Sequence, residues 1–518
     1  MSERLKHPLY PRDIVGTDRR GLLTLAVGGG LSLMAPFRAN AALPEEMKIR
    51  KAIASQQDDI ISGLQDWIAL PSIAAEDRNM AEGAVMMTEL LRSAGFQRTS
   101  IIPTDGHPGV FATLDAGASR TVAVYFMYDV KQFDASEWSS PPLEARIVDR
   151  QGLGKVMIGR GATNQKGPQA TFLAALHALR RAGLSSPVNI VLIAEGEEEI
   201  GSPNLAQIVH QNGVMESLKA CREVWMPKAC QTPEGVLDIE LGNKGLVEVE
   251  LTSSSIDWGR GARNDVHSSF KAVLDSPVWR LVKALSTLVS EDGNDPLIDG
   301  WFENVQALTV RQKELIADSI SRTPEAAFKR KLGAQKWIRD LGYRDAVERL
   351  VSQPTVNIEG IVAGYTGPGG KTVLPSRASA KLDLRLVPNQ TKAEAVSKLR
   401  AHLEKRGYGD IRIEVTGGYN PSQTDENSHL IRSMKTVARQ NHIEYALNPR
   451  LAGSWPAYIF TEAPLKLAAG HFGLGHGSKQ HAPDEYYVIE SSNPKVCSLV
   501  QATLGNVEFL YALAAISR

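Results

Sequence analysis

The stretch VNIVLIAEGEEEIGS, residues 188–202, decides the fold class of this chain. Its first part, VNIVLIA, is largely apolar and β-branched, which is typical of a buried strand. An acidic cluster follows at once, made of Glu195, Glu197, Glu198 and Glu199. Carboxylates crowded at a strand end repel one another, so at least one of their pKa values should be raised. The pattern favours an acid/base or cation-binding loop at a strand end over a solvated run of charge.

Two stretches upstream complete a strand, helix, strand pattern. TVAVYFMYDV, residues 121–130, is β-branched and aromatic and indicates a second buried strand. QATFLAALHALRRAG, residues 169–183, has apolar residues at helical spacing and ends at a glycine. This alternation predicts an α/β sheet with helices on its faces, in which ligands bind beyond the carboxyl ends of the strands.

The chain is long enough for more than one domain, and its pattern of apolar and polar residues changes twice along the sequence. It has 518 residues, and a single hydrophobic core seldom extends over a chain of this length. A separate α+β domain is indicated from about Gly245. This region begins with the alternation of GLVEVELTSSS, continues through a charged helical region, and ends in a strand, helix, strand pattern up to DIRIEVTGG. We therefore expect a discontinuous domain made of residues 42–243 and 419–518, with a second domain inserted at 244–418.

The first residues resemble an export signal. TDRRGLLTLAVGGGLSLMAPFRANAA, residues 17–42, has Arg19 and Arg20, then a short apolar run, then the A-x-A site Ala39-Asn40-Ala41. The paired arginines are typical of a twin-arginine signal. The apolar run is short and rich in glycine for a membrane span. We expect residues 1–41 to be removed and the mature protein to work in the periplasm, free of the membrane.

Composition excludes several classes of function. The formal net charge is zero, so no general attraction to nucleic acid or anionic lipid is expected. Hydrophobic residues make up 43% and charged residues 22%, as in globular proteins. The cysteines, Cys221, Cys230 and Cys497, form no CxxC pair and predict no disulfide framework.

Six segments in order resemble the M20 family of metallopeptidases, in particular its dipeptidase-like members, and the related acetylornithine deacetylases and succinyl-diaminopimelate desuccinylases. The resemblance covers essentially the whole chain after the signal. Each segment alone is weakly specific, but all six in this order are strongly specific for the family fold. It implies a zinc-aminopeptidase-like α/β catalytic domain with an inserted α+β lid and dimerisation domain, and a homodimer. The segments are YFMYDVKQFD (125–134), GRGATNQKGP (159–168), EGEEEIGSPNL (195–205), NDVHSSF (264–270), TVLPSRASAKLDLRLVPNQT (372–391) and FGLGHGSKQHAPDEYYVIE (472–490).

By this resemblance the family binds two divalent metals, zinc or manganese, through a His, a bridging Asp, a Glu, a second Asp and a C-terminal His. Of these five ligands, only the Glu and the C-terminal His are kept here, as Glu199 and His481. Met127, Asn164 and Pro227 stand at the other three positions. A thioether is a poor ligand for zinc or manganese, and a proline side chain has no donor atom. We therefore expect no tightly bound metal, and at most one weak site for a single divalent metal.

The remaining functional positions match the family more closely. Glu198 corresponds to the general base, and Asp129 to the carboxylate that orients the missing His ligand. The resemblance implies that His267 reaches the neighbouring subunit's site to polarise the scissile carbonyl. It also implies that substrate carboxylate is bound by Arg385 together with Gly453 and Ser454 of LAGSWP, residues 451–456, and that Glu485 keeps its spacing from the C-terminal His.

Two lysines adjoin the altered ligand positions. Lys131 follows the lost His segment and Lys228 follows Pro227. An ammonium beside the acidic loop could neutralise charge where the family uses a metal. The alternative is that both side chains point to solvent, as most lysines do.

Three functions remain open at this point. The first is an exported M20-type hydrolase that cleaves the amide bond of a small peptide or N-acyl amino acid with a free carboxylate. The second is a metal-free acid/base enzyme on the same scaffold, such as a lyase, a cyclase or an acyl-transfer enzyme. The third is a non-catalytic protein that binds a carboxylate-bearing ligand. The fold and the kept binding residues favour the hydrolase, which we take as the leading interpretation, while the altered metal ligands favour the second and third functions.

Overall fold

The protein is described by a computed structural model that covers residues 43–515. All of these residues belong to one compact unit. The expected export signal, residues 1–41, lies outside the described residues. Among the described residues, no helix has both the length and the apolar character needed to cross a membrane. Cys221, Cys230 and Cys497 are buried free thiols.

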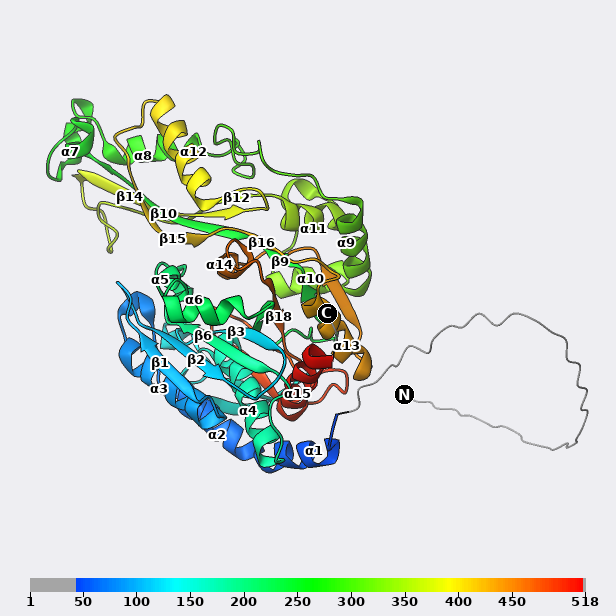
Figure 1. Ribbon diagram of the computed structural model, residues 1–518. Helices are drawn as coiled ribbons and strands as arrows, with labels where there is room; N and C mark the ends of the chain where they lie inside the picture. The colour runs from blue at the N-terminus through cyan, green and yellow to red at the C-terminus, as the bar shows by residue number, and fades with distance from the viewer. Residues whose placement is uncertain (1–42, 516–518) are drawn as a thin grey trace, which may run out of the picture. The chain divides into compact units, whose positions relative to one another are not determined.

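A six-stranded sheet confirms the predicted α/β architecture (Figure 1). β3, β6, β7 and β18 run parallel, and β1 and β2 extend one edge as antiparallel strands. Parallel strands place their carboxyl ends at one edge of the sheet, so the segments after β3 and β6 come together there. In spatial order the strands are β1 (Arg98–Ile102), β2 (Gly109–Leu114), β6 (Asn189–Glu195), β3 (Thr121–Met127), β7 (Glu223–Pro227) and β18 (Ala468–Phe472).

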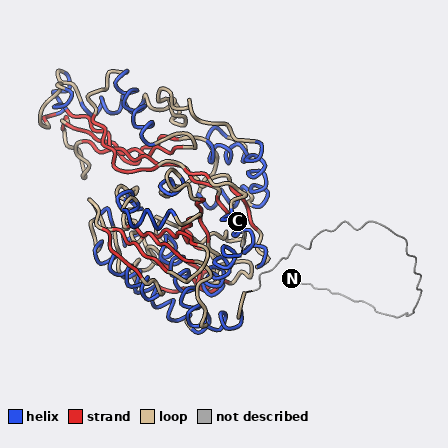
Figure 2. The backbone as a smooth tube through the Cα atoms, in the orientation of Figure 1, coloured by secondary structure: helices blue, strands red, loops and turns tan. Residues whose placement is uncertain are grey.

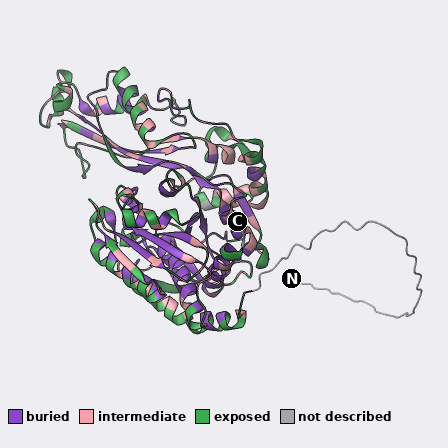
Figure 3. Cartoon of the chain, viewed as in Figure 1, coloured by how far each residue is buried: buried purple, intermediate pink, exposed green. Residues whose placement is uncertain are grey.

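Alternation along the central strands divides the core into two apolar clusters, one on each face of the sheet. In β3, Val124 and Phe126 join one cluster, whereas Tyr125 and Met127 join the other. Figure 3 shows the buried strands of this sheet in purple. The first cluster is covered by α1 (Glu46–Ser55), α2 (Gln57–Ala69), α3 (Met80–Ala94), α4 (Gly167–Arg181), α13 (His429–Gln440) and α15 (Leu499–Ala515). The second is covered by α5 (Leu205–Val209), α6 (Asn212–Lys219) and α14 (Tyr458–Thr461).

Residues 245–419 form an antiparallel four-stranded sheet with its own apolar core, as expected for an α+β insertion. α8 (Pro277–Ser286) and α12 (Lys392–Lys405) pack on this sheet (Figure 2). The charged helical region becomes α9 (Val310–Arg322), α10 (Glu325–Leu332) and α11 (Tyr343–Ser352). Leu315 of α9 lies in the core of the central sheet, so this region is shared between the two parts. The strands, in order, are β12 (Thr355–Ala363), β14 (Arg377–Leu386), β10 (Gly245–Ser254) and β15 (Arg412–Tyr419).

A second four-stranded sheet brings two distant segments together. It contains β19 (Gly477–Ser478), β20 (Tyr486–Ser491), β5 (Gly154–Ile158) and β4 (Arg146–Arg150). Tyr486 pairs with Ile158, so the residues just before β20 lie beside the residues just after β5. The remaining short elements are α7 (Ser255–Trp258), β8 (Leu237–Glu240), β9 (Gly242–Asn243), β11 (Val266–His267), β13 (Val373–Leu374), β16 (Ser422–Gln423) and β17 (Tyr445–Asn448).

Candidate active site

The acidic loop is held in place by Asp129. Asp129 lies two residues after the end of β3, and the loop follows the neighbouring parallel strand β6. The Asp129 carboxylate accepts hydrogen bonds from the backbone N–H of Glu198 at 3.3 Å and of Glu199 at 2.9 Å. Burial and the charge of Glu199 raise the pKa of Asp129 well above its ordinary value. In this chain Asp129 therefore positions the two glutamates, and its expected catalytic role stays a prediction.

The GRGATNQKGP loop is anchored by Glu485. The carboxylate of Glu485 is fully buried and bonds the Arg160 guanidinium at 2.7 Å. It also accepts the backbone N–H groups of Gly161 at 3.0 Å, Thr163 at 2.9 Å and Asn164 at 2.8 Å. These four bonds follow from the β5–β20 register, which brings the two segments together. They direct the side chain of Asn164 toward the acidic loop.

Glu199, His481 and Asn164 converge in the structure, as the resemblance implies. His481 Nε2 lies 3.1 Å from Glu199 Oε2, and Asn164 Nδ2 lies 2.6 Å from Glu199 Oε1. Asn164 Nδ2 is also 3.2 Å from His481 Nε2. Burial works to raise the pKa of Glu199, but the hydrogen bond and charge of His481, with the charge of Lys131, outweigh it and hold that pKa below its ordinary value.

Glu198 is the carboxylate at this loop that remains available. Its side chain is half-buried, and within residues 43–515 no hydrogen bond reaches its carboxylate. Burial raises the pKa of Glu198 well above its ordinary value, and the charges of Glu199 and Asp129 add to this rise. A carboxyl with a raised pKa in a site of this kind is suited to proton transfer. The role of Glu198 as general base stays a prediction.

The donor atoms present do not fit the two-metal centre that the resemblance implies. Met127 is 1% exposed, and its side chain packs in the apolar cluster with Tyr125 and Phe460. Pro227 ends β7 and offers no side-chain donor. Asn164 presents its N–H₂ group to Glu199, because an amide oxygen at 2.6 Å from a carboxylate oxygen would be repelled. In the described part of the chain, no three His, Cys, Asp or Glu side chains are grouped as metal ligands.

A second group of polar residues joins the α+β sheet to the loop before α14. Arg385 in β14 donates to Ser454 Oγ at 3.1 Å and to Asp383 Oδ2 at 2.8 and 3.1 Å. Gly453 is next to Ser454 in the same loop. Asp383 was missed by sequence reasoning. Its position two residues before Arg385 on one strand puts both side chains on the same face, and this signal could have identified it.

His267 stands apart from these residues. Its ring nitrogens contact the hydroxyl oxygens of Ser269 at 2.8 Å and Thr372 at 3.2 Å, and its side chain is exposed. Within the described residues of one chain, it bonds none of the other candidate site residues. Its expected action on a neighbouring subunit stays a prediction.

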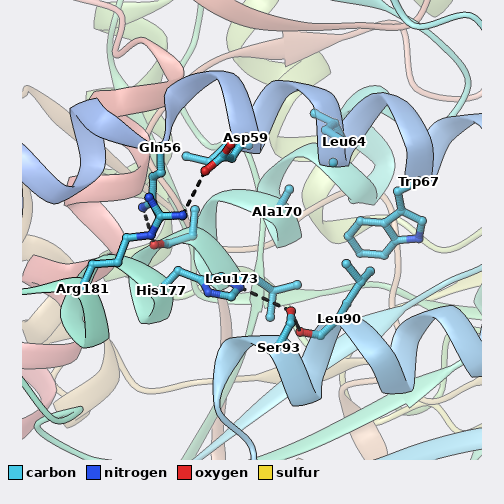
Figure 4. A pocket seen from close by; sticks show the side chains of 13 residues that line it. Gln56, Asp59, Leu64, Trp67, Leu90, Ser93, Ala170, Leu173, His177 and Arg181 are labelled. Atoms are coloured by element: carbon cyan, nitrogen blue, oxygen red, sulfur yellow. Dashed lines mark hydrogen bonds and ion pairs between the residues drawn. The ribbon is translucent and has the colours of Figure 1, made fainter.

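One cavity, of about 170 Å³, lies away from the candidate site. It is formed by α2, α3 and α4, and Figure 4 shows Trp67, Leu173 and His177 around it. His177 lies 3.4 Å from Ser93 Oγ, and burial lowers the pKa of His177. None of the candidate catalytic or binding residues lines this cavity.

Comparison with known proteins gives consistent matches over most of the chain. A model of the peptidase family M20/M25/M40 matches residues 128–506. Cys-Gly metallodipeptidase dug1 of Schizosaccharomyces pombe is 29% identical over 379 residues, 69% of this chain and 75% of that protein. Beta-Ala-His dipeptidase of Homo sapiens is 26% identical over 428 residues, 75% of this chain and 79% of that protein. The structure of the M20 family metallo-carboxypeptidase Sso-CP2 from Sulfolobus solfataricus matches with a TM-score of 0.78 and 32% identity, covering 88% of this chain and 99% of that one.

Proposed function

Because the chain belongs to the peptidase family M20/M25/M40, we propose that it is a hydrolase that cleaves the amide bond of a small peptide or N-acyl amino acid with a free carboxylate. The observation that carries this proposal is the pairing of Arg385 with Ser454. A guanidinium beside a hydroxyl is a suitable receptor for a carboxylate. The names of the two dipeptidases and the carboxypeptidase described above indicate that these relatives act on substrates of this class.

Within the proposed reaction, Glu198 transfers the protons. Asp129 fixes the backbone of Glu198. The raised pKa of the Glu198 carboxyl strengthens it as a base toward water, and the protonated carboxyl that results can return the proton to the leaving amine. Arg385 holds the substrate carboxylate, and Asp383 fixes the guanidinium from its other side. The bound carboxylate then fixes the position of the amide bond relative to Glu198.

The residues at the altered ligand positions favour a second candidate function. In a zinc hydrolase the metal lowers the pKa of its bound water to about 7, which makes hydroxide formation easier by roughly 12 kcal/mol at 1.36 kcal/mol per pKa unit. A general base contributes about 10²–10⁴-fold, which is roughly 3–5 kcal/mol. With Asn164 and Met127 at ligand positions, the second candidate is a metal-free acid/base enzyme, or a protein that binds a carboxylate-bearing ligand without cleaving it.

We further propose that the protein is a homodimer joined through its α+β sheet region. Four large apolar side chains are exposed in the segments that flank His267, and exposed apolar surface of this kind is what an interaction surface would use. Dimerisation would bury these side chains and bring His267 to another subunit. They are Ile256 at 73%, Phe270 at 52%, Val273 at 79% and Trp279 at 60% exposure.

Export to the periplasm is also a proposal. It is supported by Arg19, Arg20 and the A-x-A site in the sequence. The three cysteines are buried and free, so the fold needs no disulfide in either compartment.

The function can be tested on the mature chain, residues 42–518. A panel of dipeptides and N-acyl amino acids is followed by mass spectrometry for cleavage and by calorimetry for binding. Glu198→Gln should reduce cleavage by about 10²-fold or more while leaving binding intact. Arg385→Ala should weaken binding by about 10-fold or more, since hydrogen bonds to charged groups contribute roughly 1.5–3 kcal/mol. Arg377→Ala, on the same strand, is the control and should change neither.

The outcomes separate the candidates. Cleavage that Glu198→Gln abolishes supports the hydrolase. Binding without cleavage, sensitive to Arg385→Ala, supports the binding protein. If no member of the panel is bound or cleaved, or if Arg377→Ala weakens binding as much as Arg385→Ala, the proposed carboxylate site is wrong.

A further inference from the structure

The carboxylate of Glu199 is already enclosed by donors from the protein. Its side chain is 4% exposed. Oε1 accepts the amide N–H of Asn164 at 2.6 Å. Oε2 faces the imidazole of His481 at 3.1 Å and the ammonium of Lys131 at 3.6 Å. Lys131 Nζ also donates to the backbone carbonyl of Glu199. An ammonium and an amide N–H₂ thus point at the oxygens that a divalent cation would need.

Lys131 is held in this position from both ends. It lies in the same segment after β3 as Asp129, two residues further on, and Asp129 accepts the backbone N–H of Glu199. The ammonium returns to the carbonyl and the carboxylate of Glu199. These contacts join the segment after β3 to the loop after β6 by two routes. A lysine that merely projects to solvent would make neither contact.

Lys228 provides an internal comparison. It adjoins the altered ligand position Pro227, as Lys131 adjoins that of Met127. Within the described residues, however, Lys228 forms no ion pair with the acidic loop, and its backbone N–H bonds Phe472 in β18. Of the two lysines beside altered ligand positions, Lys131 is the one whose charge reaches Glu199.

We propose that the ammonium of Lys131 is the resident cation of this site and, together with the Asn164 amide, supplies beside Glu199 and His481 the counter-charge and contacts that a divalent metal supplies in relatives. A positive charge at 3.6 Å from Glu199 Oε2 repels an incoming divalent cation and neutralises the carboxylate that would attract it. Glu199 therefore receives its counter-charge from the chain itself. This inference goes beyond the proposed function and does not depend on which substrate is bound.

The experiment uses the mature chain without substrate and measures zinc and manganese content, calorimetric zinc affinity and thermal unfolding. The wild type should contain less than one equivalent of metal. Its melting temperature should be unchanged by zinc, manganese or a chelator. Lys131→Met leaves Glu199 with less counter-charge, so its melting temperature should fall without metal and recover with zinc. Its zinc affinity should rise by about 10-fold or more, the scale of effects from groups around a metal site.

Three further variants control the result. Lys131→Arg keeps the charge and should still exclude zinc. Lys228→Met removes a nearby charge that does not reach Glu199 and should leave zinc affinity unchanged. Lys131→Gln keeps a donor for the Glu199 carbonyl without a charge, and it replaces Lys131→Met if that variant does not fold.

Two results would overturn the proposal. One is a wild-type protein that carries tightly bound zinc or manganese whose removal lowers its melting temperature. The other is a folded Lys131→Met or Lys131→Gln variant with the zinc affinity of the wild type. Both measurements are made without substrate, so a failure to find hydrolysis would count against the proposed function and leave this inference standing.

Discussion

The anchoring of the GRGATNQKGP loop by Glu485 allows a quantitative prediction. Replacing Glu485 with alanine leaves the Arg160 guanidinium buried without its partner, since the two side chains are 0% and 3% exposed. It also removes the acceptor of three backbone N–H groups in the loop. Removing one partner of a buried ion pair costs about 3–5 kcal/mol. We expect Glu485→Ala to lower the free energy of unfolding by that amount.

The matched control lies five residues away in sequence. Glu490 in β20 forms an ion pair with Lys155 in β5 at 2.8 Å, and both side chains are about half exposed, at 51% and 48%. Exposed pairs contribute roughly 0–1 kcal/mol. Glu490→Ala should therefore change the free energy of unfolding by no more than about 1 kcal/mol. The two variants remove the same side chain from neighbouring positions and differ in burial.

Urea unfolding at pH 7, followed by tryptophan fluorescence, measures both variants against the wild type. Glu485→Gln keeps an acceptor for the N–H groups without the charge and should fall between the wild type and Glu485→Ala. If Glu485→Ala and Glu490→Ala are equally stable, the buried pair does not hold the loop, and the placement of Asn164 needs another cause.

Other predictions concern pH, export and assembly. Burial and the charge of Arg450 lower the pKa of Lys244 to about 8. Between pH 8 and about pH 10 the unfolded chain still holds this proton and the folded chain has lost it, so the stability of the wild type relative to Lys244→Met should rise over that range. Urea unfolding measures this difference, and a difference that stays constant with pH would contradict the prediction. Changing Arg19 and Arg20 to lysine should leave precursor in the cytoplasm, seen by fractionation and immunoblotting, and normal periplasmic accumulation would remove the twin-arginine assignment. Val273→Asp, at a side chain that is 79% exposed, should convert the dimer to a monomer in light scattering, whereas a wild type that is already monomeric would contradict the proposed assembly.

The sequence by itself determined the elements and the order of the motifs. The apolar run before Glu195 and the β-branched run before Met127 each encode a buried strand, and parallel strands necessarily end at one edge of the sheet. From this rule the meeting of Asp129 with the acidic loop could be expected before any coordinates. The pairing of Glu199 with His481 was implied by the family resemblance, and Met127 could be placed on a strand but not among specific neighbours.

The tertiary structure decided which side chains from distant segments meet. Glu485 and Arg160 are 325 residues apart, and only the pairing of β5 with β20 makes them partners. Sequence reasoning could not separate Lys131 from Lys228, since each adjoins an altered ligand position, yet only Lys131 is in contact with Glu199. The physical reason is that local periodicity fixes the face on which a side chain lies, whereas the reach of a charged side chain depends on how separate elements pack.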